Sequence, residues 1–337
     1  MPRLPQDFPF DADNLIYRIK EYSTNPEWGW KPNERPINEL LSFAVINLDK
    51  PPNLTSHEVS AYIARIFGLK KVAHGGTLDP GVSGILPIAL ERATPLARIL
   101  LKSNKEYVIV MRLHGEVDTE RIIQVVNEFK GEIYQRPPLR SAVTRRTRIR
   151  KIYDIEVLDV DGRDVLLRVY CEAGTYMRKL CTDIGDILGV GAHMIDLRRT
   201  KSGIFVEDDT LCTMQDLIDA WGIYQEEGND ELLRKYVLPA EIAALSLPRI
   251  IVNDGAVGAL TYGAQLYVPG IVAFSSNIKR GDLVAIFTIK GELIALAKSI
   301  MTSEEIKEKE KGQVTEETRI LMPRDLYPPM WKKKKNV

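Results

Sequence analysis

The chain has 337 residues, of which 45% are hydrophobic and 27% are charged, and its formal net charge is zero. This length predicts one large domain and a smaller one, and this composition is typical of a soluble globular protein. The apolar runs are too short to cross a bilayer and no signal-peptide pattern begins the chain, so we expect a cytoplasmic protein. The three cysteines form no CxxC pair and the four histidines are scattered, which argues against a structural zinc site or a disulfide framework.

Charge is unevenly distributed although it sums to zero. Residues 134–151 hold seven basic side chains and no acidic one, whereas 226–231 and 304–310 are mainly acidic. Local charge, not the total, sets the electric field that a polyanion meets. The neutral total therefore does not exclude a nucleic-acid partner.

The N-terminal third begins with an irregular segment and then becomes periodic. The first 40 residues are rich in proline, tryptophan and charge, with a short helical pattern at 13–22, and we interpret them as an extension packed on another part of the protein. A strand is predicted at 42–52. A helix follows at 55–68, because Thr55 and Glu58 have capping-box spacing and Gly68 ends the apolar periodicity.

Helices and strands alternate through the middle of the chain. The pattern predicts a strand at 85–90, a helix at 93–103, a strand at 105–115, a helix at 118–131, a hairpin of 151–160 and 164–173, and a helix at 174–189. In this last helix we place Thr175 near the N-cap and Ile187 among the inward-facing residues. Because hairpins outnumber βαβ units, we expect an α+β fold with a mixed, mainly antiparallel sheet and flanking helices. From 248 onward, short strands separated by turns predict a small β-barrel domain with one helix at 254–262.

Asp79 is a single carboxylate in the glycine-rich stretch HGGTLDPGVSG (74–84). Asp-Pro commonly begins a turn, so one interpretation is purely conformational. The stretch lacks the Lys-Ser/Thr pair of a phosphate-binding loop, and it offers no second carboxylate of the kind that usual glycosidases need. Asp79 therefore either forms the turn or acts through a different chemistry.

Five short motifs in fixed order favour the second interpretation. They are LDKPP (48–52), HGGTLDP (74–80), KEYV (105–108), AGTYMR (173–178) and LRRTKSG (197–203). Together they resemble the TruB family of RNA pseudouridine synthases over about 38–205. RPPLRSAV (136–143) and GVGAHMIDLRRTKSG (189–203) are most similar to its dyskerin branch, the catalytic subunit of H/ACA ribonucleoproteins.

The resemblance also implies a domain organisation. A pseudouridine synthase catalytic domain would occupy 38–247, and the β-domain at 248–326 resembles an RNA-binding PUA domain. The extension 1–37 would pack on the C-terminal domain, and 327–337 would form a basic tail.

The resemblance gives Asp79 the role of catalytic carboxylate, which either adds covalently to the nucleotide or removes a proton during its rearrangement. Tyr107 would stack on an extruded base, and Arg178 would pair with Asp79 and keep it ionised. Further residues that would line the pocket are Tyr176, Leu197, Lys50 and His74. Considered singly, these residues also fit ordinary roles as strand aromatics, a surface arginine, core residues and a loop histidine. The reaction implies no metal and no other cofactor.

The basic segment corresponds to the RNA-gripping thumb loop of the family. Its candidate RNA contacts are Arg136, Arg140, Arg145, Arg146, Arg148, Arg150 and Lys151. Gly81 departs from the branch pattern, in which a basic residue commonly follows LDP, and this puts one backbone contact in doubt.

The resemblance implies RNA and protein partners. They are an H/ACA guide RNA, a target rRNA or tRNA, and three small proteins: a zinc-ribbon or linear scaffold protein, a glycine-arginine-type β-barrel protein and a kink-turn-binding ribosomal-type protein. The short basic tail favours an archaeal source. Two alternatives stay open, a stand-alone synthase acting on the tRNA T-loop and a non-catalytic RNA-binding scaffold, although a scaffold has no need of Asp79, Tyr107 and Arg178 together.

Overall fold

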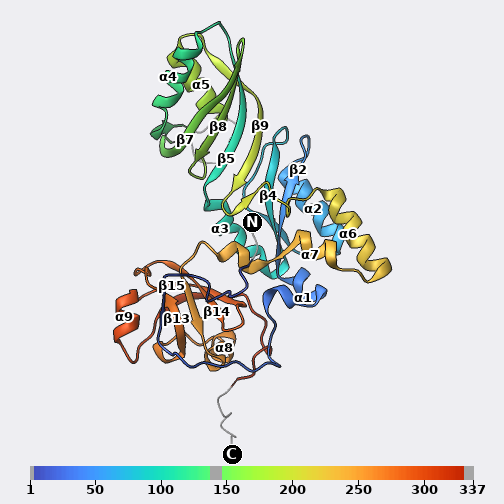
Figure 1. Ribbon diagram of the computed structural model, residues 1–337, viewed down its shortest axis with the longest axis vertical. Coiled ribbons are helices and arrows are strands. Elements are labelled where there is room, and N and C mark those ends of the chain that lie inside the picture. The colour runs from blue at the N-terminus through green and yellow to red at the C-terminus, as the bar shows by residue number, and fades with distance from the viewer. Residues whose placement is uncertain (1–3, 137–145, 330–337) are drawn as a thin grey trace, which may run out of the picture. The chain divides into compact units, whose positions relative to one another are not determined.

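The computed structural model describes residues 4–136 and 146–329, which divide into two compact units (Figure 1). Among these residues, unit 1 contains 46–89 and 94–236, and unit 2 contains 4–45, 90–93 and 237–329. In the part of the chain that the structure describes, no helix is long and apolar enough to cross a membrane.

Unit 1 is organised around one large sheet. The strands follow the order β2 (Ala44–Lys50), β4 (Ser83–Leu90), β9 (Ala192–Ser202), β5 (Lys105–Leu113), β8 (Asp164–Cys171), β7 (Arg148–Asp161) and β6 (Gly131–Gln135), with β3 (Val72–His74) beside β4 and β10 (Phe205–Val206) beside β9. β5 pairs antiparallel with both β8 and β9, and β7 pairs antiparallel with β8 and β6. β4 and β9 run parallel. The predicted mixed, mainly antiparallel sheet is confirmed.

Six α-helices accompany this sheet in the described part of unit 1. They are α2 (Ser56–Phe67), α3 (Ala97–Lys102), α4 (Thr119–Glu128), α5 (Met177–Leu188), α6 (Met214–Glu227) and α7 (Glu231–Tyr236), and a 3-10 turn (Glu91–Leu96) precedes α3. The predicted capping box of α2 is present, with the Thr55 side chain accepting from the Glu58 N–H, and Gly68 ends the helix at φ +65°. Glycine adopts this left-handed conformation without a Cβ penalty.

The prediction for α5 was wrong in one detail. Thr175 lies near the N-cap as predicted, directly before the N-cap residue Tyr176, whereas Ile187 is 51% exposed. Leu180 and Ile184 are fully buried as predicted. The helix buries only the narrow stripe that faces the sheet, and Ile187 lies outside that stripe.

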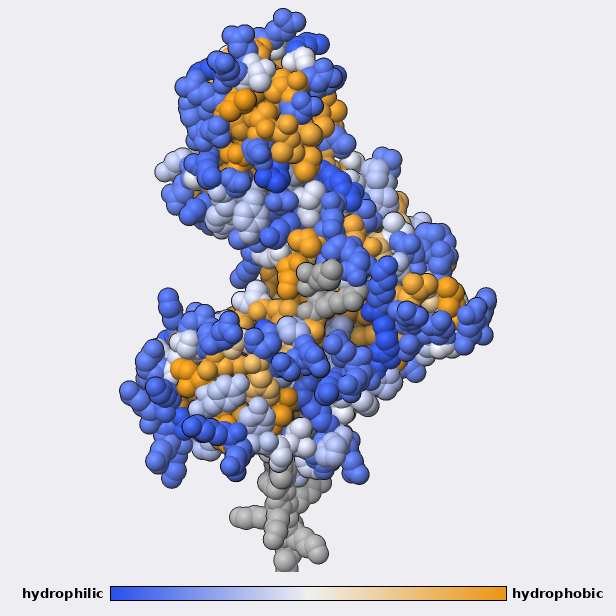
Figure 2. Space-filling model, in the orientation of Figure 1, coloured by the Kyte–Doolittle hydropathy of each residue, from blue (hydrophilic) through white to orange (hydrophobic). Residues whose placement is uncertain are grey.

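The central strands alternate between a buried and a partly exposed face. On β5, Ile109, Met111 and Leu113 are fully buried, whereas Val108 and Val110 are partly exposed. α5 packs on β9 and α4 packs on β7. Figure 2 shows apolar surface gathered on the lobe that carries these strands.

Unit 2 contains a six-stranded sheet. Its order is β1 (Leu15–Tyr17), β13 (Ile271–Ser275), β12 (Arg249–Val252), β14 (Leu283–Thr288), β15 (Leu293–Ser299) and β16 (Thr315–Ile320). The other elements are α1 (Ile37–Ser42), α8 (Asp254–Thr261), α9 (Ser303–Glu308), β11 (Val237–Pro239) and 3-10 turns at Pro32–Glu34, Ala240–Ala244 and Val268–Gly270. β12 and β14 are parallel, and the other neighbouring strands are antiparallel.

The helical pattern expected at 13–22 is not realised. Residues Leu15–Tyr17 instead form β1, which pairs antiparallel with Ala273–Ser275 of β13. A three-residue strand is too short to show a period of two in the sequence, and its partner lies far along the chain. The extension thereby supplies an edge strand to the sheet of unit 2.

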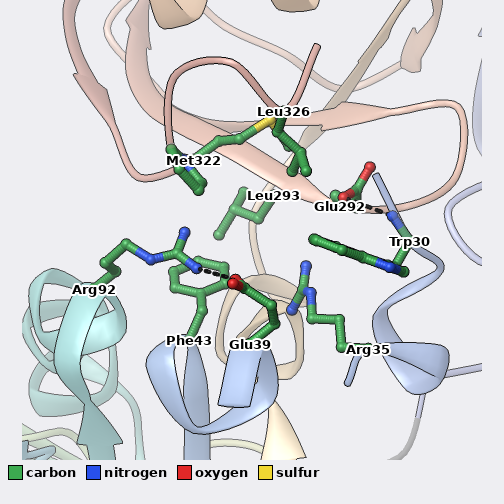
Figure 3. A pocket seen from close by; sticks show the side chains of 10 residues that line it. Trp30, Arg35, Glu39, Phe43, Arg92, Glu292, Leu293, Met322 and Leu326 are labelled. Carbon is green, nitrogen blue, oxygen red and sulfur yellow. Dashed lines mark hydrogen bonds and ion pairs between the residues drawn. The ribbon is translucent and has the colours of Figure 1, made fainter. Parts of the chain in front are cut away.

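A buried polar cluster in unit 2 joins the extension to later segments (Figure 3). The Arg35 guanidinium donates to both Glu241 carboxylate oxygens, at 2.9 and 2.5 Å, and this pair is buried. The Glu292 carboxylate accepts from the Trp30 N–H at 3.1 Å and from the Tyr327 hydroxyl at 2.6 Å. Burial raises the pKa of Glu292. One carboxyl group therefore holds segments from both ends of the described chain.

Candidate active site

Asp79 lies in a tight turn between β3 and β4. The Val82 N–H donates to the Asp79 carbonyl oxygen at 3.0 Å, which closes the turn, while the Asp79 side chain remains 50% exposed. The residue therefore both begins the turn and presents its carboxylate to solvent. A Cβ at Gly81 would meet open space, so packing does not require glycine there.

Both sides of this turn are anchored to the start of α2. The Leu78 N–H donates to the Ser56 hydroxyl at 2.9 Å, and the Asn53 N–H donates to the Pro80 carbonyl at 2.7 Å. Ser56 is the first residue of α2, whose capping box fixes the position of the helix start. The backbone on either side of Asp79 is thus held by Asn53 and Ser56, which directly follow the motif LDKPP (48–52) in the sequence.

Lys50 supports the same turn from beneath. Its ammonium group, fully buried, donates to the carbonyls of Pro51, Pro80 and Val82 at 2.8, 3.1 and 2.7 Å. Burial lowers the pKa of Lys50, and the Arg199 charge lowers it further. Lys50 therefore acts on the backbone of the turn.

Arg178 reaches Asp79 from the first turn of α5. Its Nη2 lies 2.6 Å from the Asp79 Oδ2, and the arginine side chain is 58% exposed. A charge-assisted hydrogen bond of this length restricts the carboxylate to a narrow range of orientations. Because both partners remain accessible, an RNA nucleotide can approach the pair directly.

Tyr107 lies on β5 directly opposite Arg199 of β9. The ring is partly buried, and burial raises the pKa of its hydroxyl. The positive charge of Arg199, its cross-strand neighbour, opposes this rise. Arg199 is 1% exposed and was absent from the residues singled out in the sequence, although its motif LRRTKSG was noted.

Tyr176 is held by a residue that the sequence gave no reason to select. Gln135, 1% exposed at the end of β6, donates from Nε2 to the Tyr176 carbonyl at 3.1 Å and accepts from the Tyr176 N–H at 2.9 Å. One amide side chain thus satisfies both polar groups of the tyrosine backbone. Arg178 lies two residues further along, so Gln135 helps to fix the start of α5.

Leu197 and His74 occupy different environments. Leu197 is 8% exposed on β9, opposite Ile109 of β5. His74 ends β3, with its ring edge-on to His57 at 5.1 Å between centroids. Burial lowers the pKa of His74, and the neighbouring His57 lowers it further.

The basic segment is only partly described. Arg140 and Arg145 lie outside the described residues. Arg136, Arg146 and Lys151 are exposed, and Arg148 is partly buried on β7. Arg150 pairs with Glu172 at 3.7 Å, so this one cation has an acidic neighbour from a distant part of the sequence.

Four family models match the chain in order. They are the DKCLD (NUC011) domain at 6–60, the TruB family pseudouridylate synthase N-terminal domain at 64–177, the tRNA pseudouridylate synthase B C-terminal domain at 178–244, and the PUA domain at 248–321. The named relatives include the probable tRNA pseudouridine synthase B of Pyrococcus furiosus, 57% identical over 95% of this chain and 94% of the relative. That of Methanocaldococcus jannaschii is 48% identical over 96% of each chain.

Solved structures give the same answer. The Cbf5 chain of a Cbf5-Nop10-Gar1 complex is 55% identical with a TM-score of 0.89, over 94% of this chain and 97% of that chain. An H/ACA ribonucleoprotein bound to a substrate RNA containing 2′-deoxyuridine gives 52% identity and a TM-score of 0.89 over the same shares. The chain therefore belongs to the TruB family of pseudouridylate synthases, in the branch that carries DKCLD and PUA domains.

Proposed function

We propose that this chain converts uridine in RNA to pseudouridine as the catalytic subunit of a guide-RNA-directed H/ACA ribonucleoprotein, with Asp79 as the catalytic carboxylate. The C1′–N1 bond breaks, the detached base turns, and a C1′–C5 bond forms. C5 loses a proton and N1 gains one, so the product is an isomer and the balance needs no added reactant. Archaeal relatives and the absence of a membrane-spanning helix in the described residues support a cytoplasmic site of action.

The observation that carries the proposal is the pair of Asp79 and Arg178, whose side chains are half-exposed and meet at 2.6 Å between the anchored turn and the start of α5. A guanidinium that donates to a carboxylate fixes its orientation, as a nucleophile or base requires. The likeness to the ribonucleoprotein bound to a substrate RNA adds independent support.

Other residues of the site have roles that follow from their chemistry. We assign Tyr107 to stacking on the extruded base, because every base presents a π-face to an aromatic ring. Tyr176 and Leu197 supply apolar contacts that exclude water from the detached base. The exposed cations Arg136, Arg146 and Lys151 grip RNA phosphates.

Guide RNA and small partner proteins belong to the same proposal. The structural relatives include chains solved with Nop10, or with Nop10 and Gar1. This chain has apolar surface on the lobe of β5, β7, β8 and β9 (Figure 2), with exposed side chains that include Leu158 and Ile195. Exposed apolar patches of this kind mark protein interfaces. The proposed partners are the three small H/ACA proteins, with the guide RNA gripped by the PUA domain.

The experiment incubates the purified chain with radiolabelled target RNA, with and without an H/ACA guide RNA and the three partner proteins, and maps pseudouridine. We expect product that depends on the guide. No product in the complete mixture would contradict the enzyme assignment and favour a scaffold that only binds RNA.

A second candidate function is direct modification of tRNA in the T-loop. It is favoured by the names of the relatives, which are probable tRNA pseudouridine synthases. The same assay decides between the two, because product on unguided tRNA would assign this activity to the chain alone.

A further inference from the structure

Three basic side chains lie buried around the turn that carries Asp79. Lys50 is 0% exposed, Lys105 4% and Arg199 1%. In the described part of the chain, none of the three has a carboxylate in ion-pair contact; they donate chiefly to backbone carbonyls. Desolvating a cation without a counter-charge costs several kcal/mol. A desolvation cost of this size suggests that the buried cations have a function. The three side chains differ in the groups that they bind.

Arg199 joins parts of the site that are far apart in sequence. Its Nε donates to the Ile85 carbonyl of β4 at 2.7 Å, and its Nη2 donates to the Gly76 carbonyl at 3.0 Å. Its side chain is also the direct cross-strand neighbour of Tyr107 on β5. Gly76 stands three residues ahead of Asp79, in the segment that leads from β3 into the turn.

The backbone around Arg199 is built for this close approach. β9 and β4 run parallel with Gly84 opposite Arg199, and a Cβ at Gly84 would lie 2.3 Å from the Arg199 carbonyl oxygen. Gly84 also has φ +102°, which a side chain would strain. Glycine at 84 therefore lets the arginine strand pack directly against the strand that follows the turn.

Lys50 and Lys105 provide an internal comparison. Lys50 binds the far side of the turn, at Pro80 and Val82, whereas Lys105 binds the last turn of α3 through the Leu100 carbonyl and Ser103. Of these three cations, Arg199 is the one that binds the segment ahead of the turn and also lies directly opposite Tyr107. A planar guanidinium holds the Ile85 and Gly76 carbonyls in fixed directions, which an ammonium group cannot reproduce.

We propose that Arg199 is a positioning residue of the active site, which fixes the Tyr107 ring relative to the turn that presents Asp79. This inference rests on the proposed function, because the stacked ring and the carboxylate must keep one separation while the base is detached and turned. A shift of about 1 Å in such a relation lowers a rate by about 10²-fold. Arg199 acts through Tyr107 and through the Gly76 backbone, without touching the nucleotide.

The kinetic test compares Arg199→Lys, Tyr107→Phe and the double variant in the reconstituted guide-directed reaction. We expect Arg199→Lys to lower the single-turnover rate at saturating RNA by about 10–100-fold, with the Kd for target RNA changed less than about threefold. We also expect the double variant to be no slower than the slower single variant, because residues that act as a unit are non-additive. Additive losses, or a wild-type rate for Arg199→Lys, would overturn the proposal.

The matched control is Arg249→Lys. Arg249 is another buried arginine, 7% exposed, that donates to the Pro9 carbonyl and pairs with Asp11 in unit 2. This change is expected to lower the unfolding temperature and leave the single-turnover rate within about threefold of wild type. Equal rate losses in both variants would mean that Arg199 serves stability alone.

A second readout does not depend on catalysis. Amide hydrogen exchange in peptides covering 74–82 is expected to be at least about tenfold faster in Arg199→Lys than in wild type and in Arg249→Lys, because the Gly76 carbonyl loses its anchor. Unchanged exchange there would overturn the inference even if the enzyme is active. Faster exchange together with an inactive wild type would instead contradict the proposed function and keep the anchoring role.

Discussion

At the scale of single residues, the site consists of a few exposed groups held by buried ones. Asp79 and Arg178 form a solvent-exposed ion pair. Lys50, Gln135 and Arg199 are buried and bind backbone atoms. In the proposed function the exposed groups face the nucleotide, and the buried groups set where the exposed ones lie. Substitutions in the two sets should therefore have different signatures.

Asp79→Asn is expected to abolish pseudouridine formation, with a rate loss of about 10²–10⁴-fold or more, because the amide has neither the basicity nor the nucleophilicity of the carboxylate. Binding of guide RNA should be unchanged, since the turn keeps its backbone anchors. Quantitative mapping of pseudouridine and a filter-binding assay measure the two effects. Asp186→Asn, at an exposed position of α5, is the control; near-normal turnover in Asp79→Asn would refute the site assignment.

The contact between Asp79 and Arg178 was predicted from the motifs that hold them, whereas contacts that depend on the fold alone could not be predicted. Asp79, Tyr107 and Arg178 each lie in a short motif of fixed order. Gln135 bonds to a partner 41 residues away and Arg199 to one 114 residues away. No local pattern encodes such a pairing. The exposure of Ile187 was not predicted for a related reason. Periodicity shows which face of a helix is apolar, but not how wide a stripe of that face is buried.

At the scale of elements, the junction between α3 and β5 shows how a buried lysine serves the fold. Lys105 begins β5 and donates to carbonyls at the end of α3, where unpaired acceptors and the helix dipole favour a cation. Burial, with a further contribution from Arg199, lowers the pKa of Lys105 to about 7. The charged form is therefore disfavoured by folding.

This lowered pKa gives a pH dependence of stability with a defined sign. Between about 7 and the ordinary 10.5, the unfolded chain binds more protons at Lys105 than the folded chain does. The free energy of unfolding should thus rise with pH in this window by up to about 1.4 kcal/mol per pH unit from this group. We expect Lys105→Met to lack that rise in denaturant titrations, and Lys102→Met, an exposed change on α3, to retain it. Identical pH slopes in all three proteins would rule out the interpretation.

The buried carboxyl of Glu292 changes the free energy of unfolding with pH in the opposite direction. Its pKa is raised by burial, so the folded state favours the protonated form. Its contribution to stability is fully present below the unfolded pKa, roughly 4.3, and is lost as pH rises through the folded value. Glu292→Gln should remove that loss and make the stability of unit 2 less sensitive to pH across this range. Calorimetry from acid to neutral pH measures it, with the exposed Glu308→Gln as control; a steeper dependence in Glu292→Gln would contradict the argument.

At the scale of the whole molecule, a neutral chain concentrates its cations where RNA is proposed to bind. Net charge is zero, yet 134–151 carries seven basic residues and no acidic one. Sequence alone located this segment. It did not reveal that Arg150 has Glu172 as a neighbour, because that contact depends on the fold.

Charge reversal of Arg136, Arg146 and Lys151 is expected to weaken RNA binding in a salt-dependent manner. Each lost phosphate contact should reduce the slope of log K against log[salt] by about 0.7–0.9. Fluorescence anisotropy with guide and target RNA over a salt series measures the slope. Arg121→Glu, on α4, serves as the comparison; a slope equal to that of wild type would remove the thumb assignment.

The pairing of β1 with β13 has a consequence for biogenesis. Residues 15–17 leave the ribosome early, whereas their strand partner at 273–275 is among the later parts to be made. Unit 1 lies between them in the chain and can fold before the strand partner of β1 has been synthesised. The sheet of unit 2 is thus completed only near the end of translation, so a prematurely terminated product would contain unit 1 without a finished second unit.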